Sequence, residues 1–330
     1  MKACMCSNME NKIKIRSAGA LTTIQDYGRL GYQSQGFSPS GVVDQEAMEI
    51  GNILVGNPLE EAVLECTLIG PGIEFMTDTR IALTGADMQA KIGDRQIPTC
   101  QCIPVAAGDV LTMGVAAKGC RAYIAIAGGF QVPLVLGSKS LNQKCKIGGG
   151  YGRPLQAGDM LSTGENTAST IRNPEALQQE VQSSKSKMEE KLHTVHVIMG
   201  PQETLFTKEG RKTFLHNTYE ITNDSNRMAC KLQGKPIESV HGSDIISDGI
   251  AMGAIQVASN GQPIVMLSDR QTTGGYGKMA TVISTDIPIF AQCRPGDQVV
   301  FQAVSLRWAQ KQYRKKRKRI QAEGRNTHGL

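Results

Sequence analysis

The sequence lacks the short motifs that mark several common enzyme folds. The glycine-rich stretch 272–278 has no glycine at its opening position and no Ser or Thr after Lys278, so it is not a P-loop. No G-x-G-x-x-G fingerprint follows a predicted strand, the five histidines form no H-E-x-x-H pair, and no G-x-S-x-G elbow occurs. These absences exclude a standard P-loop ATPase, a Rossmann dehydrogenase, a zincin and a hydrolase with a serine elbow.

Long apolar runs and paired cysteine motifs are missing as well. No stretch approaches the roughly 18–20 apolar residues that a membrane span needs, and the opening MKACMCSNMENK has no apolar run of signal-peptide length. The nine cysteines are an odd number, with no C-x-x-C pair and no histidine beside one at zinc-finger spacing. We therefore expect reduced thiols, no metal site and a cytoplasmic protein that neither spans a membrane nor is exported.

Positive charge is concentrated at the C-terminal end. The net charge is +6, and the stretch 307–325 holds nine basic residues against one acidic residue. The rest of the chain has 27 basic and 29 acidic residues and sums to −2, so a nucleic-acid-binding surface on the folded body is not supported. The tail is expected to be a solvated, frayed end, with contact to RNA or anionic lipid as the alternative.

Glycine and proline indicate strands joined by turns. The 330 residues contain 36 glycines and 13 prolines, too many for a helical bundle, and the length suggests two domains of roughly 100–200 residues. One helix is expected at about 44–55, where Asp44 can cap the first turn and Gly56-Asn57-Pro58 ends it. The predicted division is a first domain at 13–163, a polar linker at 164–191 with a short helix near 174–181, a second domain at 192–305 and a basic tail at 306–330.

Three segments concentrate polar side chains that are costly to bury. They are Q-D-Y-G-R-L-G at 25–31, S-N-R at 225–227 and D-R-Q-T-T-G-G-Y-G-K at 269–278. Purely structural interpretations are an Asp–Arg pair that pins a loop, an Asn/Ser turn with an exposed arginine, and a long hairpin loop. The run G-G-G-Y-G-R at 148–153 is a weaker candidate of the same kind.

The third segment suits an anionic or carbonyl-bearing ligand. It follows the apolar run 264–267, so a strand delivers consecutive polar side chains into a Gly-Gly turn. Asp269 could act as a base, and Arg270 or Lys278 could clamp a carboxylate or a phosphate. The amides of the two glycines could stabilise an oxyanion.

At these residues the sequence resembles the KipA/PxpC family, also called allophanate hydrolase subunit 2 or biotin-dependent carboxyltransferase-like proteins. The signatures Q-D-x-G-R, S-N-R-M and D-R-Q-T-T-G-G-Y occur in order, together with L-E-C-T-L-I-G-P-G-I-E-F and A-Q-C-R-P-G-D. Ala229, Lys231, Ala258 and Gly277 depart from the residues usual in the family. The resemblance implies a mainly β fold with tandem cyclophilin-like β-barrel domains and a few short helices.

The resemblance also implies a subunit of a bacterial ATP-dependent 5-oxoprolinase, which opens 5-oxo-L-proline to L-glutamate. Such a subunit would act with a PxpA-like partner and a PxpB/KipI-like partner, and ATP would be bound with or by those partners. We expect catalysis at Asp269, Arg270, Gln271 and Lys278. We expect substrate binding at Gln25, Asp26, Arg29, Asn226, Arg227, Thr272, Thr273, Gly274, Gly275 and Tyr276.

Two other functions are compatible with the same resemblance. One is a carboxyltransferase that accepts the carboxyl group from carboxybiotin and acts on urea or a related amide, although the chain has no A/V-M-K-M biotinyl-lysine motif. The other is a non-enzymatic antagonist of a sensor-kinase inhibitor, which would sequester a PxpB-like partner.

Overall fold

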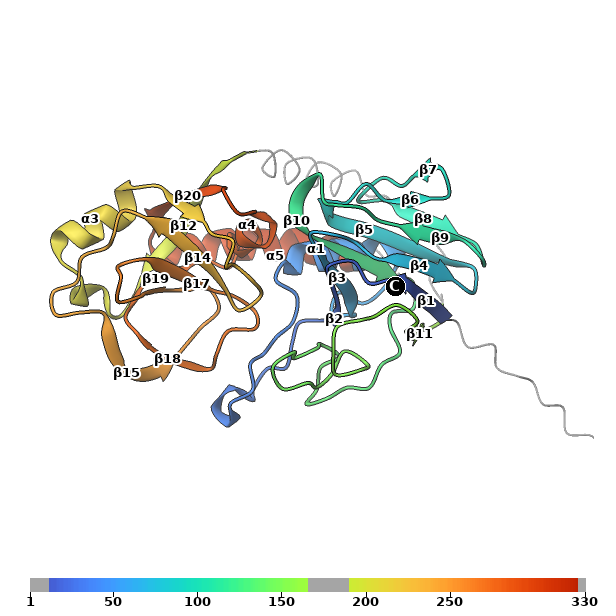
Figure 1. Ribbon diagram of the computed structural model, residues 1–330, viewed down its shortest axis with the longest axis horizontal. Helices are drawn as coiled ribbons and strands as arrows, with labels where there is room; N and C mark the ends of the chain where they lie inside the picture. The colour runs from blue at the N-terminus through green and yellow to red at the C-terminus, as the bar shows by residue number, and fades with distance from the viewer. Residues whose placement is uncertain (1–11, 166–189, 326–330) are drawn as a thin grey trace, which may run out of the picture.

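Figure 1 shows a mainly β molecule with two halves side by side. The structure is a computed structural model and describes residues 12–165 and 190–325. Strands β1 to β11 make up the first half, strands β12 to β20 make up the second, and helices α1 and α5 lie between them (Figure 1). No helix in the described ranges is both long and apolar enough to cross a membrane. The short helix expected near 174–181 lies outside the described residues.

The first half consists of two sheets. The strands of one, in spatial order, are β11 (Met160–Ser162), β1 (Lys12–Ser17), β4 (Gly72–Phe75), β9 (Val110–Thr112), β6 (Lys91–Ile92) and β7 (Arg95–Gln96). The strands of the other are β2 (Leu21–Gln25), β3 (Val63–Thr67), β10 (Lys118–Ile126), β5 (Thr79–Asp87) and β8 (Cys102–Val105). Each described pairing in these sheets is antiparallel.

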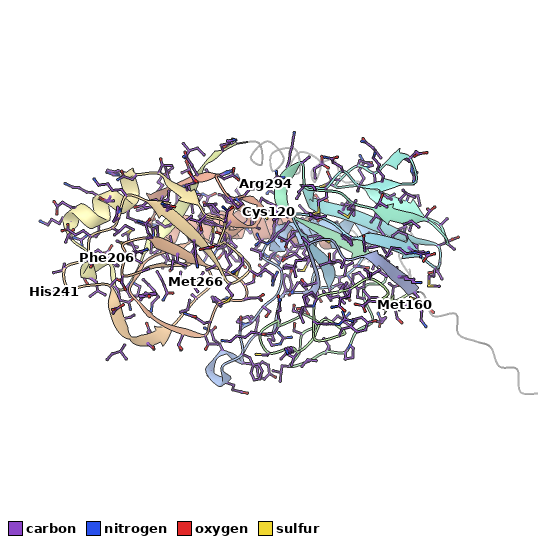
Figure 2. All side chains as sticks on the ribbon, viewed as in Figure 1. Cys120, Met160, Phe206, His241, Met266 and Arg294 are labelled. Atoms are coloured by element: carbon purple, nitrogen blue, oxygen red, sulfur yellow. The ribbon has the colours of Figure 1, made fainter. Side chains whose placement is uncertain are left out.

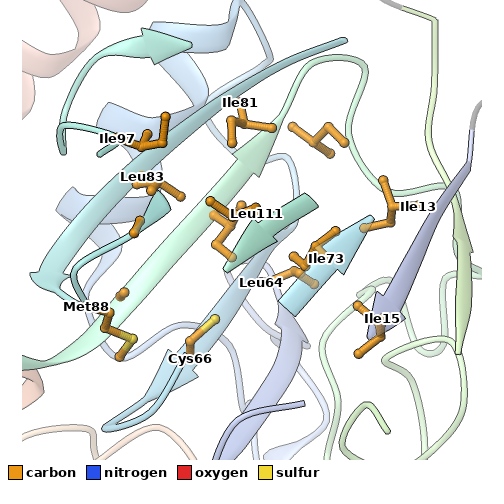
Figure 3. Close-up of a cluster of buried hydrophobic side chains, with 14 of the residues drawn as sticks. Ile13, Ile15, Leu64, Cys66, Ile73, Ile81, Leu83, Met88, Ile97 and Leu111 are labelled. Atoms are coloured by element: carbon orange, nitrogen blue, oxygen red, sulfur yellow. The ribbon is translucent and has the colours of Figure 1, made fainter. Parts of the chain in front are cut away.

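Alternation along the strands builds the first core. In β1, Ile13 and Ile15 are buried while their neighbours are more exposed, as expected for a strand with one solvated face. They join Ile73 and Leu111 of their own sheet and Leu64 of the other sheet in one cluster (Figure 3). Strand β10 is buried along almost its whole length because sheet neighbours flank it and α1 packs on its other face.

Helix α1 (Gln45–Val55) is the helix that the sequence predicted, with nearly the same ends. The carboxylate of Asp44 accepts the backbone N–H of Ala47 at 3.0 Å, and Gly56 ends the helix in the left-handed region at φ 81°. The helix covers β5 and β10 with a side that buries Met48, among other residues. It thereby closes the outer face of the five-stranded sheet.

The second half is a closed barrel, which confirms the barrel that the resemblance implied. Its strands, in order around the barrel, are β12 (Leu192–Met199), β19 (Lys278–Val282), β16 (Ala254–Val257), β17 (Pro263–Met266), β14 (Ala229–Gly234), β13 (Tyr219–Ile221) and β20 (Gln298–Ala303). The parallel pair β12–β20 closes the ring. A separate two-stranded sheet joins β15 (Asp244–Gly249) to β18 (Thr273–Tyr276), as Figure 1 shows below the barrel.

Shorter elements complete the second half. Helix α3 (Lys208–His216) is capped by the Thr207 hydroxyl, which accepts the N–H of Gly210 at 2.9 Å. Helix α4 (Ile287–Gln292) has a proline in its first turn and ends at Cys293. One-turn 3₁₀ helices, η1 (Gln33–Gln35) and η2 (Glu203–Leu205), lie in loops of the first and second halves.

The basic tail is not the frayed end that we expected from its charge. It forms helix α5 (Leu306–Arg325), which packs against α1. Ile320 is only 2% exposed, Lys316 forms an ion pair with Glu46, and Arg317 Nη1 lies 2.5 Å from Glu49 Oε1. The expectation was wrong because the charges are sorted onto two faces. The face of α5 that packs against α1 carries Ile320 and the paired cations Lys316 and Arg317. The opposite face carries the solvated cations.

Docking of α5 can be tested at its buried isoleucine. Because Ile320→Ala removes buried methyl groups and leaves a cavity, we expect it to lower the free energy of unfolding by about 2–5 kcal/mol. Lys318→Ala, an exposed change on the same helix, is expected to stay within about 0.5 kcal/mol of the wild type. Urea denaturation measures both, and equal values for the two variants would show that α5 is undocked in solution.

The cap of α1 makes stability depend on pH. Burial raises the pKa of Asp44 to about 6, above its ordinary value near 3.8. The folded protein therefore holds a proton that the unfolded chain releases, and this stabilisation is lost as the pH rises from about 4 to about 6. Asp44→Asn keeps a capping oxygen and should remove about 1–3 kcal/mol of this pH dependence. Urea denaturation of both proteins at pH 4 and pH 7 measures the difference.

Candidate functional site

Two of the polar segments predicted from the sequence, S-N-R at 225–227 and D-R-Q-T-T-G-G-Y-G-K at 269–278, come together where the two halves join. The S-N-R segment ends at Arg227, two residues before β14 begins, and Asp269 follows β17, which is paired with β14. The antiparallel pairing continues past the strand ends, because Leu267 N donates to Met228 O at 2.8 Å and Asp269 N to Arg227 O at 2.9 Å. Two segments 42 residues apart in sequence therefore lie side by side.

Arg227 connects the second half to the first. Its Nε donates to Asp269 Oδ2 at 2.8 Å, its Nη1 pairs with the Glu65 carboxylate, and its Nη2 donates to Gly41 O at 2.6 Å. Burial alone would lower the pKa of this guanidinium, but the Asp269 and Glu65 carboxylates raise it above its ordinary value. The interpretation of this segment as an Asn/Ser turn with an exposed arginine is therefore wrong for Arg227. Asn226 does fit a turn, because it is exposed and its Oδ1 accepts the N–H of Met228 at 2.7 Å.

Glu65 is a partner that the sequence analysis missed. It lies in β3, fully buried, where its Oε2 accepts the N–H of Val43 at 2.9 Å and its Oε1 lies 3.9 Å from Arg121 Nε. The sequence did contain a signal for this residue, because Glu65 is a single carboxylate inside the apolar run 62–68. Such a residue is rarely buried without a cation, so its presence indicates a buried partner elsewhere in the chain.

Gln25 and Asp26 organise the first-half loops. Gln25 Oε1 accepts the N–H of Gly41 at 3.1 Å, and Gly41 is also the residue whose carbonyl Arg227 contacts. The Asp26 carboxylate accepts the hydroxyls of Ser138 and Ser140 at 2.6 and 2.5 Å. It also accepts the backbone N–H of residues 28 and 139 at 2.7 and 2.6 Å. The expected Asp–Arg pair is not formed, because Asp26 pins the loop through hydroxyls and amides.

Arg29 is a buried cation with no carboxylate in contact among the described residues. It is 1% exposed, its Nη2 donates to Ser140 O at 2.5 Å, and its Nη1 has no hydrogen-bond partner in that part of the chain. Burial lowers the pKa of the guanidinium, and Asp26 and Asp269 partly oppose that effect from a distance. A buried charged donor left unpaired is costly, so this side chain is suited to receive an anion or a carbonyl oxygen.

Arg270 is a second such cation. It is 7% exposed and its hydrogen bonds go to backbone carbonyls, from Nε to Ile250 O at 2.9 Å and from Nη1 to Leu267 O at 3.4 Å. Burial lowers the pKa of this guanidinium as well. Gln33 of the first half donates from Nε2 to the same Ile250 carbonyl at 2.9 Å and to Thr272 O at 3.1 Å. Arg270 therefore lies at the contact between the halves.

Lys278 belongs to a neighbouring polar cluster. Its Nζ lies 2.7 Å from Asp248 Oδ2, and this hydrogen bond lowers the pKa of the Asp248 carboxyl. Gln256 of β16 lies opposite Lys278 in the barrel, is buried, and donates from Nε2 to Tyr276 O at 3.3 Å. The sequence analysis missed Gln256, although an amide in the apolar strand A-I-Q-V was a visible signal.

The D-R-Q-T-T-G-G-Y segment is partly loop and partly strand β18. Gln271 and Thr273 are exposed, Thr272, Gly275 and Tyr276 are half-buried, and Gly274 is buried. A Cβ at Gly274 would lie 2.7 Å from a methyl of Ile250 and 2.9 Å from Gln256 Nε2, so a larger residue there would require these side chains to move. The same virtual atom lies 3.1 Å from Gln271 Nε2, which brings that amide beside the glycine backbone.

A cavity lies at a different place along the junction. It has a volume of about 150 Å³ and is lined in part by α1, α4 and α5, with Glu49, Met252, Tyr313 and Lys316 among its lining residues. The predicted site residues do not line it. The predicted site residues instead form separate groups: Arg29 bonds to the Ser140 carbonyl, Arg227 to Asp269 and Glu65, Arg270 to the Ile250 carbonyl, and Lys278 to Asp248.

The fold and the order of the polar segments define a carboxyltransferase-type protein. The family described as carboxyltransferase domain, subdomain A and B, matches residues 35–303, and the chain belongs to that family. It is 37% identical over 299 residues to the C subunit of 5-oxoprolinase from Escherichia coli K12, covering 91% of this chain and 93% of that protein. It is 33% identical over 303 residues to the protein of the same name from Haemophilus influenzae, covering 92% and 94%.

A solved structure shares the whole architecture. Urea carboxylase of Kluyveromyces lactis superposes with a TM-score of 0.86 at 29% identity, covering 96% of this chain. The match takes up 30% of that longer chain. The mainly β fold with its barrel is therefore shared with a protein that carries further parts.

The Arg227 contact predicts a large loss of stability on mutation. Arg227→Ala leaves the buried Glu65 carboxylate without its closest cation, so we expect the free energy of unfolding to fall by about 3–5 kcal/mol. Lys231→Ala removes an exposed ion pair nearby in the chain, 3.7 Å from Asp224, and should cost less than about 1 kcal/mol. Chemical denaturation followed by tryptophan fluorescence compares them, and a small effect of Arg227→Ala would contradict the assignment.

Proposed function

We propose that this chain is a subunit of an ATP-dependent 5-oxoprolinase that opens 5-oxo-L-proline to L-glutamate. The observation that carries the proposal is the pair of buried guanidiniums, Arg29 and Arg270, which have no carboxylate in contact within the described part of the chain. The substrate is a small anion with an amide carbonyl, which is what such donors bind. The two bacterial relatives named as 5-oxoprolinase subunits support the same reaction.

The chemistry explains why donors of this kind are needed. A five-membered lactam is a poor electrophile, so transfer of a phosphoryl group from ATP to its carbonyl oxygen makes attack by water easier. In this proposal Arg29 and Arg270 hold the carboxylate, and Gln271 and the Gly274 and Gly275 amides face the carbonyl oxygen as negative charge develops. Lys278 stays fixed by Asp248 at the edge of the site.

Asp269 is a weaker candidate for the base than its place in the sequence suggests. Both of its carboxylate oxygens accept hydrogen bonds from Arg227, at 2.8 and 3.3 Å. A substrate proton would have to compete with that ion pair. We therefore assign Asp269 the role of positioning the loop that carries Arg270 and Gln271.

The proposed enzyme needs partner subunits. The sequence has no P-loop and no dinucleotide fingerprint, so the ATP is assigned to a PxpA-like or a PxpB/KipI-like subunit, or to a site shared with one of them. The chain then supplies the donors that hold the lactam. Formation of glutamate from 5-oxoproline and ATP by the three proteins together, and by no pair of them, is the expected result. Absence of ATP-dependent glutamate from the complete mixture would reject the proposal.

Arg270 gives the sharpest activity test. In the reconstituted complex, Arg270→Ala should lower kcat/KM for 5-oxoproline by about 100-fold, because it removes a buried charged donor from the proposed site. Lys231→Ala on the neighbouring surface serves as the matched control and should leave kcat/KM within about twofold. Size-exclusion chromatography must show that both variants form the same complex as the wild type. If Arg270→Ala kept full activity, Arg270 would not be part of the substrate-binding site.

Carboxyl transfer from carboxybiotin is the second candidate, and the similarity to urea carboxylase favours it. The same donors would then meet the ureido oxygen of biotin. A biotinylated carrier that co-purifies on streptavidin with this chain would support that reaction. Turnover of 5-oxoproline without biotin would exclude it.

A non-enzymatic antagonist would also bind the PxpB-like partner. The two roles differ in what Arg270→Ala does. An enzyme subunit loses turnover while keeping the complex, whereas an antagonist has no turnover to lose.

A further inference from the structure

Three side chains with metal-binding atoms converge at one end of the barrel. They are His193 at the start of β12, Cys293 at the end of α4 and Asp297 in the turn before β20. One ring nitrogen, the Sγ atom and one carboxylate oxygen all lie within 4.8 Å of one another. None of the three belongs to the proposed oxoproline site. Sequence spacing does not reveal them, because His193 is far along the chain from the other two.

The barrel itself brings these residues together. Alternation along β12 points His193, Val195 and Val197 inward, and the parallel pairing with β20 sets His193 opposite Val299. A tight turn follows Cys293, in which Arg294 N donates to Asp297 Oδ2 at 2.7 Å and Asp297 N donates to Arg294 O at 3.0 Å. The turn folds the Asp297 carboxylate back toward the end of α4.

The imidazole and the thiol are buried without partners. His193 is 8% exposed and Cys293 is 7% exposed. Within 12–165 and 190–325, neither the imidazole nor the thiol takes part in a hydrogen bond or an ion pair, while Asp297 is half-buried. A buried imidazole normally has a partner on at least one nitrogen, because burying it unpaired is costly. A ligand that binds the imidazole and the thiol together would remove that cost.

We propose that His193, Cys293 and Asp297 bind one Zn²⁺ ion. Nitrogen, thiolate sulfur and carboxylate oxygen are the donors that zinc takes in proteins, and three protein ligands leave a fourth position for water. Tetrahedral coordination with ordinary bond lengths sets ligand atoms about 3.3–3.8 Å apart. The three ligand atoms lie within 4.8 Å of one another, and small rotations of their side chains would bring them to the distances of a tetrahedral site.

A reactive cysteine is the competing interpretation of the same trio. Nucleophilic cysteines are partly exposed and their thiols ionise easily. Cys293 is instead only 7% exposed, and its Sγ atom lies beside an imidazole nitrogen and a carboxylate oxygen. The geometry therefore favours a ligand over a nucleophile.

A metal ion at this position would stabilise the closed barrel. It would join β12 to β20 across their parallel pair and attach both to the end of α4. The same end of α4 contacts the first half, where Gln292 Oε1 accepts the N–H groups of Cys120 and Arg121, each at 3.2 Å. Arg294 Nε donates to Gly119 O at 2.5 Å, and Figure 2 shows Arg294 beside Cys120 at the junction. Zinc would thus stabilise the barrel and the contact between the halves.

Titration of the full chain with Co²⁺ and Zn²⁺ tests the proposal. The protein is prepared without a histidine tag and stripped of metal with a chelator. One equivalent of Co²⁺ should produce a sulfur-to-cobalt charge-transfer band, Zn²⁺ should displace it, and Zn²⁺ should raise Tm. Cys293→Ser should abolish the band. His193→Gln and Asp297→Asn should each weaken Zn²⁺ binding by at least about 10-fold.

The exposed thiol of Cys145 provides the matched control. Cys145→Ser should keep both the band and the rise in Tm. The wild-type readouts need no variant to fold, so they decide the matter even if Cys293→Ser is unstable. A wild-type protein with neither a cobalt band nor a zinc-dependent Tm overturns the proposal, as does a band that Cys145→Ser removes.

Discussion

The guanidinium of Arg227 donates to the Glu65 and Asp269 carboxylates and to the Gly41 carbonyl from a position closed to solvent. Glu65 and Gly41 belong to the first half and Asp269 to the second, so this one side chain links the two halves. Charges buried in this way are costly unless every partner is present, which makes the relative position of the halves specific. Separate polar contacts at the junction come from Gln292 and Arg294, which bond to residues 119–121 of the first half.

The candidate site uses the same junction for a different purpose. Gln33 reaches from the first half to the carbonyls of Ile250 and Thr272, and Arg270 shares the Ile250 carbonyl. Among the described residues, these fixed contacts leave Arg29 and Arg270 as buried cations without carboxylates, while Arg227 is fully paired. A site whose donors are held rigid before a ligand arrives loses little freedom on binding it.

Short patterns in the sequence predicted much of the local structure and less of its assembly. The helix capped by Asp44, the strand-rich composition and the order of the polar segments were visible in single residues and short patterns. The exposed Arg227, the Asp26–Arg29 pair and the frayed tail were wrong. Each of these errors concerned a charged residue, because a charge looks solvated in sequence until its distant partner is known.

The sequence by itself determined the element types, the family and the presence of charged residues in apolar strands, since periodicity, caps and turns act over a few residues. The tertiary structure alone decided which charges are paired, that α5 lies on α1, and that His193, Cys293 and Asp297 share one point. Those outcomes depend on strand pairing and on contacts between residues far apart in the chain. Local sequence patterns do not show which distant residues come into contact. Burial makes the resulting polar contacts strong.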